Sequence, residues 1–316
     1  MTLPSFVESL PHQIYVIDTG LVRDRFDAAY LVVSEGRAAF VDTGTTHAVP
    51  RLLAALAALG LERSAVDWVI PTHVHLDHAG GAGALLQELP SARMLVHPRG
   101  ARHMIDPSAL YQGALAIYGQ ERMDREYGRL IPVPASHVQV SSDGQVLELG
   151  RRPLRFMDTP GHAKHHHCIW DALSQGWFTG DTFGLCYPEL ADAHGVWSLP
   201  TTTPIQFEPE LLRASIERLL SFNPRCMYLT HFGRVEMPER IAEQQLALLD
   251  NVVQLGLSLR SSPDRQRHLE RGLAELYCES LREHGSLLSR EAIVQLLEPD
   301  ISLNASGMGV WLDRLD

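Results

Sequence analysis

The stretch Thr72-His73-Val74-His75-Leu76-Asp77-His78-Ala79-Gly80-Gly81 places three histidines and one aspartate within six residues. It follows the apolar run Trp68-Val69-Ile70, which is typical of a β-strand. Because alternate residues of an extended segment point the same way, His73 and His75 are expected to face one position, with the aspartate and third histidine one step further along. Imidazole nitrogen and carboxylate oxygen are ligands for Zn²⁺, and also for iron and manganese. The stretch therefore predicts a loop that carries two groups of ligands for two adjacent metals.

Three more ligand-type side chains occur further along the chain, each directly after a short apolar or β-rich run. They are His162 in Asp158-Thr159-Pro160-Gly161-His162, Asp181 in Phe178-Thr179-Gly180-Asp181, and His231 in Tyr228-Leu229-Thr230-His231-Phe232-Gly233. Each occupies the place where a strand would end and a loop begin. A histidine motif is confirmed only by partners elsewhere in the chain, and these residues supply them.

The order and context of these motifs resemble the metallo-β-lactamase superfamily, over roughly residues 13–235. Within it the chain is most similar to the glyoxalase-II-like group of hydrolases, in which an aspartate bridges two metals. The resemblance implies a cofactor of two divalent metal ions, expected to be Zn²⁺, with Mn²⁺ or Fe²⁺ as alternatives. One ion would bind three histidines, the other would bind an aspartate and two histidines, and a further aspartate would join both. In this order, the implied ligands are His73, His75 and His162, then Asp77, His78 and His231, and finally Asp181.

The hydrophobic pattern supports the four-layer αββα sandwich that the resemblance implies. Short strands are predicted at 13–18, 29–34, 38–42, 94–96, 146–149, 154–157, 168–170 and 177–179, and helices at 47–59 and 82–89. Two half-domains, each a sheet covered by helices on one face, would pack sheet against sheet. The metals are then expected at the edge where loops of both sheets meet.

Two segments fall outside this plan of a catalytic domain over residues 1–237. Residues 99–136 read as two helices and an extended connector, an insertion that could roof the cleft. Residues 238–316 form a C-terminal extension with apolar residues at helical spacing as far as about Leu297. For this extension we favour packing, as additional core or as the contact of a homodimer, over direct substrate binding.

Composition narrows the expected partners and location. Acidic residues outnumber basic ones by 38 to 27, and the net charge is −11, whereas nucleic-acid binding relies on clustered lysine and arginine. We therefore expect a small-molecule substrate and no nucleic acid.

The four scattered cysteines form no C-x-x-C pair, which disfavours a thiolate zinc site or a disulfide framework. No leader-like N-terminus or run of about eighteen apolar residues occurs, so a cytoplasmic protein without membrane attachment is expected.

Two segments near the predicted ligands concern substrate binding and the question of which other histidines bind metal. The loop from Thr182 to Pro204 follows the bridging aspartate, and its aromatic residues Tyr187 and Trp197 are candidate contacts to a partly apolar substrate. The run His165-His166-His167 follows a ligand histidine, but the family pattern leaves no coordination position for it. We expect these three histidines to support ligands or to meet solvent.

The predicted function is a binuclear metal-dependent hydrolase, in which a metal-bridging hydroxide attacks a small ester, thioester, lactone or phosphodiester. Asp181 would fix the separation of the metals and Asp77 would orient the nucleophile. One alternative is an iron-dependent oxidoreductase similar to persulfide dioxygenases, which the complete second set of ligands disfavours. The other is a non-catalytic binding or regulatory protein, which the retention of every ligand disfavours.

Overall fold

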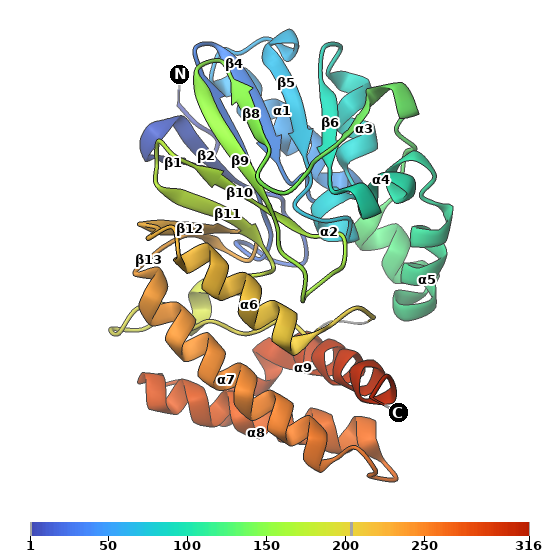
Figure 1. The fold of residues 1–316 in the computed structure, drawn as a ribbon, viewed down its shortest axis with the longest axis vertical. Helices are drawn as coiled ribbons and strands as arrows, with labels where there is room; N and C mark the ends of the chain where they lie inside the picture. Colours follow the sequence, from blue (N-terminus) through green and yellow to red (C-terminus); the bar gives the residue numbers. More distant parts are fainter. Residues whose placement is uncertain (1, 203–204, 316) are drawn as a thin grey trace.

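The protein folds as two β-sheets packed face to face, with helices on both outer sides (Figure 1). The computed structural model describes residues 2–202 and 205–315, so that Thr203 and Pro204, at the end of the loop expected beside the site, lie outside the described residues. The predicted αββα sandwich with C-terminal helices is confirmed.

The first sheet comes from the N-terminal half of the chain. Its strands, in spatial order, are β1 (Val7–Leu10), β2 (Ile14–Asp18), β3 (Ala28–Ser34), β4 (Arg37–Val41), β5 (Val66–Ile70), β6 (Arg93–Val96) and β7 (Val138–Val140). Pairing is antiparallel from β1 to β4 and parallel from β4 to β7. The carboxyl ends of β4, β5 and β6 therefore meet at one edge.

The second sheet comes from the later part of the chain, residues 146–236. Its strands, in spatial order, are β13 (Gly233–Glu236), β12 (Cys226–Leu229), β11 (Gly176–Gly180), β10 (His167–Asp171), β9 (Arg152–Asp158) and β8 (Val146–Leu149). Only the pair β11 and β12 is parallel among its pairings. The carboxyl ends of β11 and β12 thus lie side by side.

Nine α-helices occur in the described residues. They are α1 (Val49–Ala58), α2 (Leu76–Ala79), α3 (Ala82–Glu88), α4 (Pro98–Ile105), α5 (Ser108–Arg122), α6 (Pro209–Leu220), α7 (Pro238–Ser258), α8 (Arg265–His284) and α9 (Arg290–Asp313). A π-helical turn, Met123–Tyr127, continues α5. Within 2–202 and 205–315, no helix is long and apolar enough to cross a membrane.

Alternating side chains of the strands fill separate cores, as expected for sheets buried on both faces. In β11, for example, Phe178 packs between the sheets, while Trp177 faces the outer helices. In β4, Val41 lies between the sheets and Phe40 faces the helices of the other side. Each sheet thus supplies one wall of the central core and one wall of an outer core.

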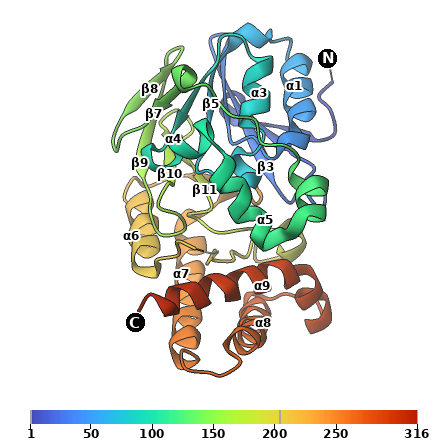
Figure 2. The same cartoon turned by 90° about the vertical axis from the view of Figure 1, so that its right-hand side faces the viewer.

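The C-terminal helices belong to the same core as the second sheet. Met227 of β12, Leu248 of α7, Tyr277 of α8 and Met308 of α9 are buried in one apolar cluster. Helix α9 continues to Asp313, well beyond the predicted helical pattern, and includes a proline within it. In Figure 2, α9 passes below α5, the long helix of the 99–136 segment.

Candidate metal centre

The seven predicted ligands come together at the ends of four strands. His73 and His75 lie in the loop after β5, and the following single-turn helix α2 carries the next two ligands, Asp77 and His78. The remaining three follow strands of the second sheet: His162 after β9, Asp181 after β11 and His231 after β12. Because these strands end at the same edge of the sandwich, residues up to 158 positions apart meet in one place. The centre therefore joins the two sheets.

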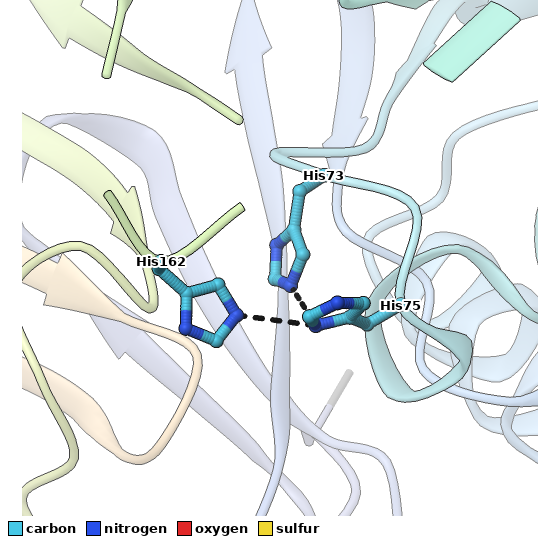
Figure 3. Close-up of side chains that lie close together, drawn as sticks. All are labelled: His73, His75 and His162. Carbon is cyan, nitrogen blue, oxygen red and sulfur yellow. Dashed lines mark hydrogen bonds between the residues drawn. The ribbon is translucent and has the colours of Figure 1, made fainter. Parts of the chain in front are cut away.

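The first group consists of three histidines whose rings converge (Figure 3). His75 Nδ1 lies 2.8 Å from His73 Nε2 and 3.1 Å from His162 Nε2. Ligands placed about 2.0–2.1 Å from a tetrahedral zinc ion are about 3.3 Å apart. The spacing of these nitrogens is therefore close to that of three ligands around one ion.

The second group contains Asp77, His78 and His231. Asp77 Oδ2 lies 3.5 Å from His231 Nε2 and 3.8 Å from His78 Nε2. The side chain of Asp77 is 28% exposed, whereas the two histidines are almost fully buried. This group therefore presents one carboxylate toward the solvent side and two imidazoles toward the interior.

Asp181 lies between the two groups and directs a different oxygen toward each. Its Oδ2 atom is 3.4 Å from His162 Nε2, in the first group. Its Oδ1 atom is 3.2 Å from His78 Nε2 and 3.8 Å from His231 Nε2, in the second. This is the arrangement that a carboxylate needs to contact two adjacent cations.

The donor set fits divalent metal ions. Among the described residues, His78 Nε2 and Asp181 Oδ1 are buried without a hydrogen-bond partner, although such atoms are normally paired. The two atoms lie 3.2 Å apart, among ligand atoms of the other candidate residues. Nitrogen and carboxylate oxygen without thiolate suit zinc, manganese and iron alike.

Burial and neighbouring charges put the histidines of the first group and Asp181 in the protonation states that bind metal. Burial lowers the pKa of His73 well below its usual range and that of His162 to about 3, so both imidazoles are neutral. Burial opposes ionisation of Asp181, but His78 and His162 hold the pKa of this carboxyl well below its usual range. Conversely, burial alone would lower the pKa of His78, but Asp181, Asp42 and Asp77 raise it. The same field that attracts a proton to His78 attracts a metal cation.

Outer contacts fix the orientation of the ligand rings, and the sequence did not reveal them. Asp42, at the end of β4, has Oδ2 at 2.9 Å from His78 Nδ1 and also accepts hydrogen bonds from Thr230 and Thr72. His231 Nδ1 donates to the carbonyl oxygen of Phe26 at 2.8 Å. Such partners leave the Nε2 atoms free for a metal. The one available signal was an aspartate directly after an apolar strand, in Val41-Asp42-Thr43-Gly44.

Two glycines allow the ligand loops to pass close to their neighbours. Gly161 has φ +133°, and a Cβ there would lie 2.3 Å from the backbone of Leu212. Gly180 has φ +46°, and a Cβ there would lie 2.5 Å from Thr72 Oγ1. Both positions directly precede a ligand, so a larger residue would displace His162 or Asp181.

The histidine run after His162 lies beside the ligand groups but does not join them. His166 Nε2 accepts the backbone N–H of Asp181 at 3.3 Å, and its Nδ1 is 2.9 Å from Thr159 Oγ1. His167 Nε2 donates to the carbonyl oxygen of Pro71 at 3.0 Å, and His165 Nδ1 accepts the backbone N–H of Val74 at 3.4 Å. These histidines therefore support the ligand loops through hydrogen bonds.

The two candidate substrate residues have different surroundings. Tyr187 lines the cleft that contains Asp77, Asp181 and His231. Trp197 does not: it is fully buried against Tyr277, and its indole Nε1 donates to Ser280 Oγ at 2.9 Å. The prediction for Trp197 is wrong, because its loop turns the ring inward against α8.

The cleft has a volume of about 760 Å³ and opens over the second ligand group. Its walls combine the loop around Phe26, helix α5 with Tyr118, the π-helical turn after it with Tyr127, and helices α8 and α9. Sequence reasoning missed the contribution of α9, which supplies residues from Glu298 to Ser306. The metal ligands thus lie at the base of a pocket large enough for a small organic substrate.

Comparison with known proteins agrees with this arrangement. The family model described as the metallo-beta-lactamase superfamily matches residues 22–231. The chain belongs to this superfamily.

A relative with the same fold is the metallo-beta-lactamase fold-containing protein ST1585 of Sulfurisphaera tokodaii. It is 26% identical over 185 residues, which cover 57% of this chain and 65% of that protein. The crystal structure of ST1585 from Sulfolobus tokodaii matches with a TM-score of 0.67 at 22% identity, covering 95% of this chain and 99% of that chain. The fold therefore extends through the C-terminal helices.

Two other relatives are hydrolases by name. The hydroxyacylglutathione hydrolase of Aeromonas hydrophila is 28% identical over 238 residues, covering 72% of this chain and 73% of that protein. The atrochrysone carboxyl ACP thioesterase of Aspergillus fumigatus is 27% identical over 232 residues, covering 73% of this chain and 54% of that protein. The match thus spans about half of the fungal thioesterase.

Proposed function

We propose that this protein is a binuclear metal-dependent hydrolase that cleaves a small carboxylic ester or thioester. The observation that carries the proposal is the position of Asp181, whose two oxygens face different groups of ligands. A single-metal protein has no need of a carboxylate in that position or of the complete second group. Zinc is the proposed metal, with manganese and iron as alternatives.

Two bound ions would supply Lewis acidity toward the scissile carbonyl and a water with its pKa lowered toward about 7. The chain supplies the remaining functions. Asp77, whose side chain is more exposed than that of Asp181, would accept a hydrogen bond from the attacking water at its Oδ atoms and orient it. His78 is held by Asp42, and His231 by the Phe26 carbonyl, so that neither ring rotates during the reaction.

Two buried cysteines, Cys168 and Cys186, do not provide an alternative nucleophile. Burial raises the pKa of Cys186, in the loop after Asp181, to about 12. Burial likewise raises the pKa of Cys168 to about 12. Both thiols are therefore protonated at neutral pH, and the thiolate is the reactive form.

The proposed substrate class is supported by the cleft and by the two hydrolase relatives. Phe26 and Tyr118, both partly exposed, give the pocket aromatic surfaces, which suit the apolar part of an acyl compound. One of the two relatives is named a carboxyl ACP thioesterase and the other a hydroxyacylglutathione hydrolase. Lactones and phosphodiesters are the alternatives to be compared with these substrates.

A hydrolysis panel on the metal-loaded protein tests the proposal. Esters, thioesters, lactones and phosphodiesters are offered with and without oxygen, while oxygen uptake is recorded. We expect ester or thioester hydrolysis at the same rate under both conditions, because attack by water involves no redox change. Oxygen consumption by an iron-loaded sample, without hydrolysis of any compound, would instead establish the oxidoreductase alternative.

A further inference from the structure

The wall of the cleft that faces the metal centre comes from the C-terminal helices. Asp300, on α9, lines the same cleft as Asp77, Asp181 and His231. It is partly buried, and α9 itself is anchored in the apolar core through Leu297 and Met308. The carboxyl group of Asp300 is therefore held in a fixed position within reach of a substrate at the metal centre.

Tyr187 orients this carboxyl group. Its hydroxyl donates to Asp300 Oδ1 at 3.0 Å. The Tyr187 ring is fully buried, stacks on Phe26 with ring centroids 5.3 Å apart, and meets the His231 ring at its edge. A carboxylate can accept about four hydrogen bonds, so the bond from Tyr187 leaves capacity for a donor in the cleft.

The other charges of the cleft make this wall negative. Glu270 and Glu298 line it together with Asp300. Apart from the metal-site residue His231, the cation among the described lining residues is Arg122, whose Nε donates to Glu126 at 2.6 Å and whose guanidinium lies over the ring of Tyr118. Arg23, behind the Tyr187 ring, is likewise bonded to Glu189. The positive charges near the cleft are thus already paired with carboxylates of the protein.

We propose that Asp300 is a specificity-determining residue, which binds an ammonium or guanidinium group of a cationic acyl ester or thioester. This inference rests on the proposed function and names its substrate class. The aromatic surfaces would contact the apolar part of the substrate, while Asp300 receives the N–H donors. An anionic thiol carrier that has no ammonium or guanidinium group would be repelled by the same wall.

The test uses matched thioesters that differ only in charge. In the first series, the acyl group is constant and the thiol is cationic, neutral or anionic. In the second series, the thiol is constant and the acyl chain is cationic, neutral or anionic. All assays are done at pH 8, because burial raises the pKa of Asp300 to about 6 and the carboxyl group is then ionised. We expect kcat/KM for the cationic member of one series to exceed that of the neutral member about tenfold or more.

In Asp300→Asn, the ratio of cationic to neutral kcat/KM should fall about tenfold, the change expected for a lost bond to a charged group. Tyr187→Phe should lower this ratio in the same direction, which provides a second variant if the first does not fold. Glu291→Gln, on the exposed start of α9 and outside the cleft, is the control and should retain the ratio.

A native enzyme without preference for the cationic members, or variants that retain the full preference, would overturn the assignment of Asp300. Hydrolysis of the neutral thioester in that case would leave the proposed function intact. Failure to hydrolyse any member of either series or any of the corresponding esters would overturn both.

Discussion

At the scale of single residues, Asp181 decides whether the two groups of ligands act together. Replacing it with asparagine keeps the size of the side chain but removes the charge shared by the two positions. We predict that Asp181→Asn loses about 100-fold or more of kcat, because loss of a ligand should exceed the 10- to 100-fold effect typical of an outer contact. Circular dichroism should show an unchanged fold, since the residue lies in a loop. Turnover within a few-fold of the native value would argue against a bridging role.

His166 provides the contrasting case. It accepts the Asp181 backbone N–H and stacks on His73, but it belongs to neither group of ligands. We predict that His166→Gln keeps the full metal content and loses only about tenfold of kcat, as for an outer contact. Elemental analysis together with steady-state kinetics checks this. Loss of one metal from the variant would mean that the coordination sphere has been misplaced.

The candidate ligands were predictable from the sequence because four of them lie within six residues and the other three each follow a short apolar or β-rich run. The partners that orient them were not, because they lie far away in the chain. Asp42 is 36 residues from His78, and the Phe26 carbonyl is 205 residues from His231. The direction of Trp197 was also hidden, since an aromatic residue in a loop can face either the cleft or the core.

At the scale of elements, the strands in the interior of each sheet were predicted, and three outer strands were missed. β1, β7 and β13 all lie at a sheet edge and contain only three or four residues. Each of these three strands has at most two apolar residues, whereas β8, the fourth edge strand, has three and was predicted. Helix α2 was missed because a single turn has no detectable periodicity.

A buried ion pair connects elements of the second sheet. Arg152 of β9 and Asp171 of β10 are almost inaccessible to solvent, with Arg152 Nε 2.9 Å from Asp171 Oδ1. Arg152 also donates to the carbonyl oxygen of His12, beside the first sheet. Burial would raise the pKa of Asp171, but the hydrogen bonds and charge of Arg152 hold it below its usual range.

A carboxyl group with a lowered pKa in the folded state stabilises the protein above its unfolded pKa, about 3.9, and loses this contribution as the pH falls through the folded value. We predict that Asp171→Asn lowers the free energy of unfolding at pH 7 by about 3–5 kcal/mol, because Arg152 is left buried without its partner. Between pH 4 and 2, native protein and variant should become more alike. Urea unfolding at several pH values measures both effects, and a constant difference down to pH 2 would contradict them.

At the scale of the whole molecule, the metal centre connects the two sheets, since His73 to His78 follow β5 and the other ligands follow β9, β11 and β12. The C-terminal helices complete the cleft from the opposite side. Their packing was predictable from the apolar spacing, but the pattern could not show that residues of α9 from Glu298 to Ser306 line the cleft that contains metal ligands. Which residues of α9 line the cleft depends on the position and direction of this helix relative to the two sheets.

Metal removal should therefore destabilise the fold as well as abolish activity. A ligand present at 1,000 times its dissociation constant stabilises the native state by about 4 kcal/mol. We predict that chelation lowers Tm by roughly 5 °C or more, and that zinc restores it. Differential scanning calorimetry on the native, chelated and reconstituted protein makes the comparison. An unchanged Tm after complete removal of metal would show that metal binding at this centre does not stabilise the fold.

The metal content of the purified protein and of two ligand variants tests the binuclear centre most directly. His162→Ala removes a ligand of the first group, and His231→Ala removes one of the second. Elemental analysis should give two ions per native chain and about one in each variant, because each substitution damages a different position. One ion in the native protein, or two in both variants, would contradict the binuclear centre.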